Sequence, residues 1–190
     1  MELHDFSTKQ IFWSNLLLII CCAFYLVWWI LAFKPTGAVK GMKTGWLLIP
    51  AFAAGLAAVI LAERGILSAP VGVTLFPEGL LFWGGIAGYL ILLAVTRLLF
   101  QRQVTSELLL IMGWAVLALA EINALYGVGR FPHRLAVVFV VAIGVATWIS
   151  LVCYVLYYRL GERAGYFDGM IPLCLAALVM AGISVAMVVS

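Results

Sequence analysis

Six apolar segments, each about twenty residues long, constrain the fold of this chain more than any other feature of its sequence. A helix of about 20 residues is long enough to cross a hydrocarbon core of about 30 Å. We therefore predict an all-α fold, a polytopic integral membrane protein in which a bundle of six transmembrane helices forms a single transmembrane domain over residues 1–190. The predicted spans cover about residues 11–33, 45–62, 79–100, 107–126, 135–158 and 170–189.

The composition identifies lipid as the solvent of these helices. Hydrophobic residues make up 66% of the 190 residues and charged residues only 10%, whereas a soluble domain carries about 25% charged residues. No soluble core could absorb so much apolar sequence. The net charge of +3 is small and spread along the chain, which argues against a nucleic-acid partner. The predicted localisation is the cell membrane, as a multi-pass protein with membrane lipid as a partner.

Lysine and arginine residues between the spans predict the orientation, because the side richer in them faces the inside. Seven follow the first, third and fifth spans: Lys34, Lys40, Lys43, Arg97, Arg102, Arg159 and Arg163. Four lie on the other side: Lys9, Arg64, Arg130 and Arg134. Both termini are therefore predicted outside. The N-terminal MELHDFSTKQ is mildly acidic, unlike the basic start of a signal peptide, so the first span is expected to be retained.

Glu121 is a carboxylate placed well inside an apolar segment. Glu107, Trp114 and Glu121 are spaced seven residues apart, so they lie along one stripe of the fourth helix. Asn123 and Tyr126 follow near the outer end of the same helix. A carboxylate within a span costs several kcal/mol unless it faces a partner, water or a ligand. Glu121 is therefore predicted to be a functional residue.

Structural alternatives exist for each acidic residue of the later spans. Glu121 could form a pair with Arg130, with Arg134 or with a buried tyrosine hydroxyl. Glu107 is favourable in the first turn of a helix because of the helix dipole. Asp168 is expected to cap a sixth helix that begins near residue 170.

Polar and aromatic side chains recur at helical spacing in three other spans. They are Ser14 or Asn15, Cys22, Tyr25 and Trp29 in the first span; Glu78, Gly85, Tyr89 and Thr96 in the third; and Thr147, Ser150, Tyr154 and Tyr157 in the fifth. If these faces converge, they enclose a lane of hydroxyls and rings suited to a small polar or cationic solute. The candidate substrate-binding residues are Glu121, Asn123, Tyr126, Trp114, Tyr89, Tyr25 and Tyr154. The alternative is that the hydroxyls bond their own helix and the rings form an interfacial belt.

The longest connection outside the spans is residues 64–78, RGILSAPVGVTLFPE. Glycine and proline break it too often for a span, and it is too apolar for an ordinary solvated loop. We expect either a small hairpin or a flap that lies on the mouth of the bundle.

Catalytic and cofactor signatures are missing from the sequence. It contains no GxSxG, P-loop or HExxH pattern. The two histidines, His4 and His133, are both predicted at the outer surface, which argues against haem or a histidine-based metal site in the membrane. The four cysteines lie inside apolar runs and do not form a secreted disulfide framework. No enzymatic activity, cofactor or metal is predicted.

The leading functional prediction is a small membrane channel or transporter for a small polar or cationic solute, with Glu121 near the outer end of the path. The alternative is a non-transporting membrane module, either a lipid-binding protein or a subunit of a larger membrane complex. Small residues at helix-packing spacing, such as Ala51 with Gly55 and Gly84 with Gly88, let helices approach closely and leave room for a homo-oligomer. Solute binding is expected to depend on pH across the interval in which Glu121 titrates.

Overall fold

Six long helices form the structure, a computed structural model that describes residues 2–33, 44–69, 73–77, 79–98, 106–157 and 159–189. The helices are α1 (Glu2–Phe33), α2 (Leu48–Leu67, preceded by the short 3-10 helix η1, Thr44–Leu47), α3 (Leu80–Leu98), α4 (Ser106–Gly127), α5 (His133–Leu156) and α6 (Glu162–Val189). All six are long and apolar enough to cross a membrane, and the described residues contain no strand. The predicted all-α class and multi-pass architecture are confirmed.

Two helices extend well beyond the predicted spans. α1 begins at Glu2, and α6 begins at Glu162 rather than near residue 170. Asp168 therefore lies inside α6, so the prediction that it caps this helix is wrong. Pro172 also lies inside α6. Hydropathy located the apolar part of this helix but could not show that the polar stretch before it continues the same helical turns.

α1 and α2 form a closely packed antiparallel pair. The residues of α2 buried against its neighbours are all small: Ala51, Ala58, Ala62 and Gly65. A Cβ atom on Gly65 would lie only 2.8 Å from Ile11 and 3.1 Å from the backbone oxygen of Ser7. Without a hydrophobic driving force between helices in lipid, such small surfaces let the backbones approach closely enough to associate.

α3 packs on α4 through glycines. Of the predicted pair, Gly84 and Gly88, only Gly88 lies at this contact. A Cβ atom on Gly88 would lie 3.3 Å from Met112, whereas one on Gly84 would meet nothing within 4 Å. Gly85 makes the closest approach, since its Cβ atom would lie 2.5 Å from Val116. The contacting face of α3 is therefore rotated by one residue from the predicted Gly84 side.

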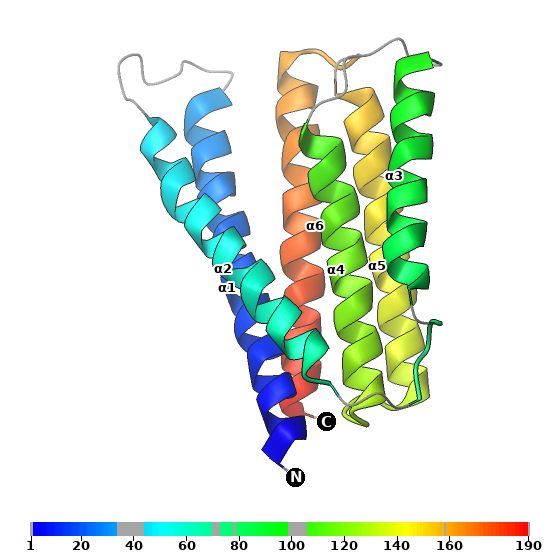
Figure 1. Cartoon of the computed structure of the whole chain (residues 1–190). Helices are drawn as coiled ribbons and strands as arrows, with labels where there is room; N and C mark the ends of the chain where they lie inside the picture. Colours follow the sequence, from blue (N-terminus) through cyan, green and yellow to red (C-terminus); the bar gives the residue numbers. More distant parts are fainter. Residues whose placement is uncertain are drawn as a thin grey trace.

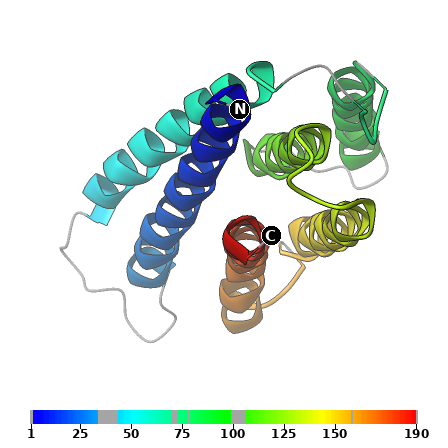
Figure 2. The ribbon, with the colours of Figure 1, turned by 90° about the horizontal axis from the view of Figure 1, so that it is seen from below.

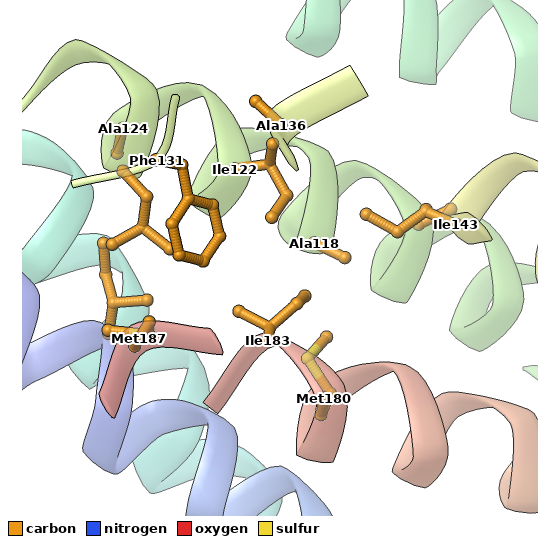
Figure 3. Packing of buried hydrophobic residues seen from close by; sticks show 12 residues of the cluster. Ala118, Ile122, Ala124, Phe131, Ala136, Ile143, Met180, Ile183 and Met187 are labelled. Atoms are coloured by element: carbon orange, nitrogen blue, oxygen red, sulfur yellow. The ribbon is translucent and has the colours of Figure 1, made fainter. Parts of the chain in front are cut away.

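α3, α4, α5 and α6 run roughly along one direction, the α1–α2 pair is inclined to them, and both termini lie at the same end (Figure 1). α1 contacts α2 and α6, while α4 contacts α3 and α5. Seen along the bundle, α1 lies between α2 and the C-terminal end of α6 (Figure 2). Near the end that holds the termini, side chains of α4, α5 and α6 converge in an apolar core (Figure 3). This core includes Ala118, Ile122, Ile143, Met180 and Ile183.

Large apolar side chains cover the outside of the bundle. Phe52 is 73% exposed, Trp148 is 69% exposed and Leu178 is 68% exposed. In water this surface would be an aggregation hazard, whereas in lipid it is the surface that the solvent requires. The protein is therefore a multi-pass membrane protein.

Candidate functional site

Glu121 lies in the buried part of α4, in the same half of the bundle as the apolar core. Its side chain has no exposed surface. The next residue, Ile122, and the residues one turn before and after it, Ala118 and Leu125, are also fully buried. A carboxyl group in this position is shielded from bulk solvent, and its stability depends on the partners that it finds inside the bundle.

The observed partner of Glu121 is Ser14 of α1. The Ser14 hydroxyl donates to the Ala58 carbonyl oxygen at 2.9 Å and to Glu121 Oε1 at 3.2 Å. Two turns earlier on α1, the Ser7 hydroxyl donates to the Gly65 carbonyl oxygen at 2.6 Å. Ser7 and Ser14 are seven residues apart on α1, and their acceptors Gly65 and Ala58 are seven residues apart on α2, as an antiparallel pair of helices requires. This pairing places Ser14 where it also reaches α4.

A hydroxyl group carries one proton, so Ser14 cannot donate to both acceptors at once. With Glu121 ionised, the two bonds are alternatives. With Glu121 protonated, its own O–H can donate to Ser14 Oγ while Ser14 donates to Ala58. The geometry thus accommodates a proton shared between the serine and the carboxyl group.

Several buried polar atoms on the same two helices, α1 and α4, have no hydrogen-bond partner among the described residues. They are Glu121 Oε2, both amide atoms of Asn15, Gln10 Oε1 and Trp114 Nε1. Asn15 follows Ser14 directly and has no exposed surface. Gln10 lies about one turn before Ser14, and Trp114 lies about two turns before Glu121 on the same stripe. We call these five residues, Gln10, Ser14, Asn15, Trp114 and Glu121, the Glu121 cluster.

Neither arginine of the structural alternative reaches Glu121. The Arg130 guanidinium donates instead to the carbonyl oxygen of Met187 near the end of α6, with Nε at 3.1 Å and Nη2 as the second donor. Arg134 is exposed at the start of α5. Arg130 therefore satisfies a carbonyl that the end of a helix leaves without a partner, and the alternative in which Glu121 pairs with one of these arginines is not formed.

Asn123 holds the connection between α2 and α3 against α4. Its Oδ1 accepts hydrogen bonds from the backbone N–H groups of Leu75 at 2.8 Å and Phe76 at 3.2 Å. Leu75 also packs against the apolar core. The described part of the connection, residues 73–77, is thus a flap docked on α4, while residues 70–72 and 78 lie outside the described residues.

The remaining predicted residues are distributed over other parts of the bundle. The Tyr126 ring packs edge-on against the His133 ring, with centroids 5.9 Å apart. The Tyr25 ring packs against Trp28 at 5.2 Å, eleven residues beyond Ser14 and so about 16 Å farther along α1. Tyr154 is buried in α5, and Tyr89 is partly exposed in α3. Of the seven candidates, only Glu121 and Trp114 belong to the Glu121 cluster.

A second buried carboxyl group lies inside α6. Asp168 is 8% exposed, and its Oδ2 has no hydrogen-bond partner among the described residues. The Cys153 thiol of α5 lies within hydrogen-bond reach of this carboxyl group. The signal that could have located it is Pro172, four residues later, since a proline this near the predicted helix start also fits the interior of a longer helix.

The described residues contain no group of three or more histidine, cysteine, aspartate or glutamate side chains placed to hold a metal ion. Comparisons with protein-family models, with curated proteins and with solved structures found no match.

Proposed function

We propose that this protein is a small membrane channel or transporter that binds a small polar or cationic solute at the Glu121 cluster. The observation that carries the proposal is the fully buried Glu121 Oε2, which has no partner among the described residues, together with the equally buried and unpartnered amide of Asn15, the residue after Ser14. Leaving such groups unpaired costs about 1–3 kcal/mol each. A native structure that retains several of them around one carboxyl group is expected to satisfy them with a ligand, a proton or water.

The chemistry of these atoms fits a solute with N–H donors. Glu121 Oε2, Asn15 Oδ1 and Gln10 Oε1 are acceptors, and a positive charge on the solute would compensate a carboxylate far better than a neutral donor. Asn15 Nδ2 and Trp114 Nε1 are donors that can bind a carbonyl group or bridging water. This set supports a cationic or amide-like solute.

The position of the flap and the predicted orientation indicate which end of the proposed path is the outer one. Residues 73–77, held by Asn123, cover α4 near the end of the bundle that contains both termini. From the lysine and arginine distribution we propose that this end faces outside in the cell membrane. Four of the cations behind this assignment, Lys34, Lys40, Lys43 and Arg102, lie outside the described residues.

The alternative, a non-transporting membrane module, is favoured by one contact. The Ser14 hydroxyl links the α1–α2 pair to α4 through Glu121, and a purely structural bridge of this kind would suit a lipid-binding protein or a subunit of a larger complex. A homo-oligomer fits either proposal, because small residues remain available on the outer faces of the bundle.

The test is ligand-dependent stability and binding of the purified protein with panels of ammonium ions, amides, inorganic cations and lipids. A ligand that prefers the native state raises the unfolding temperature. We expect an ammonium ion or an amide to stabilise the wild type, Glu121→Gln to fold and lose this effect, and Glu63→Gln to retain it. Glu63 is the matched control, because it is an exposed glutamate in α2.

Two results would contradict the transport proposal. Stabilisation by lipids alone would favour the membrane-module alternative. A Glu121→Gln variant that binds the solute as the wild type does would remove Glu121 from the site. Flux of the stabilising solute into proteoliposomes then separates transport from binding alone.

A further inference from the structure

We propose that the bundle contains a second cation-binding site at Asp168, and that the ligand of this site is a small ammonium cation. This inference deepens the proposed function, on which it rests for the idea that a solute crosses the bundle. Binding at Asp168 itself does not require the Glu121 cluster.

α1 and the segment that ends α5 both pack on the face of α6 that carries Asp168. Gly165, Asp168 and Gly169 are spaced three and four residues apart, so they lie on one face of the helix. A Cβ atom on Gly169 would lie 2.3 Å from the Trp29 ring of α1, and one on Gly165 would lie 3.4 Å from the backbone oxygen of Tyr157, the residue directly after α5. The two glycines therefore let Trp29 and Tyr157 lie directly against this face.

The aromatic residues stand beside each other at this face. The ring centroids of Trp29 and Tyr157 are 5.8 Å apart. Trp29 is 6% exposed and is fixed by a hydrogen bond of 3.1 Å from Nε1 to the Tyr166 carbonyl oxygen. With its N–H committed to the backbone, what Trp29 offers a ligand is its ring, and an indole face attracts cations more strongly than other aromatic rings do.

Asp168 keeps one carboxyl oxygen without a partner in the described part of the chain, although the Cys153 thiol lies within hydrogen-bond reach of the group. Its side chain is buried, and Oδ2 has no partner among the described residues. Pro172 stands four residues later and has no N–H group to donate to the Asp168 carbonyl oxygen, so the main chain at this position also lacks its helical donor.

This combination selects a particular ligand chemistry. A carboxylate oxygen and a freed carbonyl oxygen accept N–H bonds, while adjacent Trp and Tyr rings attract the charge and the methyl groups of an organic cation. Neutral hydrogen-bonding solutes would leave the carboxylate charge uncompensated. A small ammonium cation, with methylammonium as the probe, satisfies both kinds of group.

The Asp168 site is distinct from the Glu121 cluster. The core residue Ile183 packs in the same apolar cluster as Ile122, the neighbour of Glu121. Asp168 precedes Ile183 by fifteen residues, which corresponds to about 22 Å along the axis of α6. The two carboxyl groups thus lie toward opposite ends of the bundle, as two binding sites along one path would.

The test measures methylammonium binding to the purified full chain by calorimetry, at constant ionic strength set with N-methylglucamine chloride. The wild type is expected to bind about two equivalents, one for each buried carboxyl group with an unpaired oxygen. Asp168→Asn and Glu121→Gln are each expected to lose one equivalent, and the double variant both. Glu162→Gln, an exposed glutamate in the first turn of the same helix, is expected to keep both.

The outcomes distinguish the two proposals. A single equivalent that Glu121→Gln removes and Asp168→Asn keeps would overturn the Asp168 site and leave the proposed function standing. A single equivalent that Asp168→Asn removes and Glu121→Gln keeps would establish the second site and overturn the role of Glu121. Absence of binding to the wild type would overturn both.

A measurement on the wild type covers the case in which Asp168→Asn does not fold. Dicyclohexylcarbodiimide is an apolar reagent that couples to carboxyl groups in membranes, and mass spectrometry of peptides locates the adduct. Methylammonium is expected to protect the Asp168 peptide as well as the Glu121 peptide. If it protects only the Glu121 peptide, Asp168 has a structural bond with Cys153 and no ligand.

Discussion

At the scale of single residues, a substitution of Asn15 tests whether this residue serves the stability of the fold or the binding of a solute. Replacing it with leucine, which has the same branched heavy-atom shape, removes two buried polar atoms that have no partner among the described residues. Asn15→Leu is therefore expected to raise the free energy of unfolding by about 1–3 kcal/mol and to abolish solute binding at the Glu121 cluster. Thermal unfolding and binding titrations of the same preparation test this trade-off. A variant that is less stable and still binds would show that Asn15 has a structural partner and is not part of the site.

At the scale of elements, Asn123 decides whether the flap stays on α4. Asn123→Leu removes the acceptor for the N–H groups of Leu75 and Phe76, so we expect faster hydrogen exchange across residues 73–77 and a loss of about 1–3 kcal/mol of stability. Asn123→Asp keeps a side-chain oxygen in the same place and serves as the matched control. Exchange mass spectrometry of the peptide that contains this segment is the measurement. Equal protection in Asn123→Leu and the wild type would mean that Leu75 packing alone holds the flap.

At the scale of the whole molecule, the orientation in the membrane can be measured with two matched cysteines. Arg134→Cys and Arg163→Cys each replace one exposed arginine, at opposite ends of the bundle, in a background without the four native cysteines. An impermeant thiol reagent applied to intact cells is expected to label position 134 and not position 163, because the end with fewer cations is predicted outside. Labelling after permeabilisation shows that both sites are reactive. The opposite labelling pattern would place both termini inside.

The sequence by itself determined the class of fold, because an apolar segment about 20 residues long in lipid must satisfy its backbone within its own helix. It also identified Glu121 as a carboxyl group inside a span, since hydropathy and helical period are properties of one segment. The ends of α1 and α6 were beyond this reasoning. Polar turns that continue a helix past its apolar part look like loops in sequence, which is why the sequence predicts a cap at Asp168.

Only the tertiary structure decided which groups meet. Ser14 and Glu121 are 107 positions apart in sequence, and their contact depends on the register of α1 against α2 and α4. The same register leaves Arg130 at the carbonyl of Met187 instead of at Glu121. It also directs Asn123 to the flap and brings Trp29 against Gly169. Helix period fixes the face on which a side chain lies, but the packing of small residues between helices fixes what that face meets.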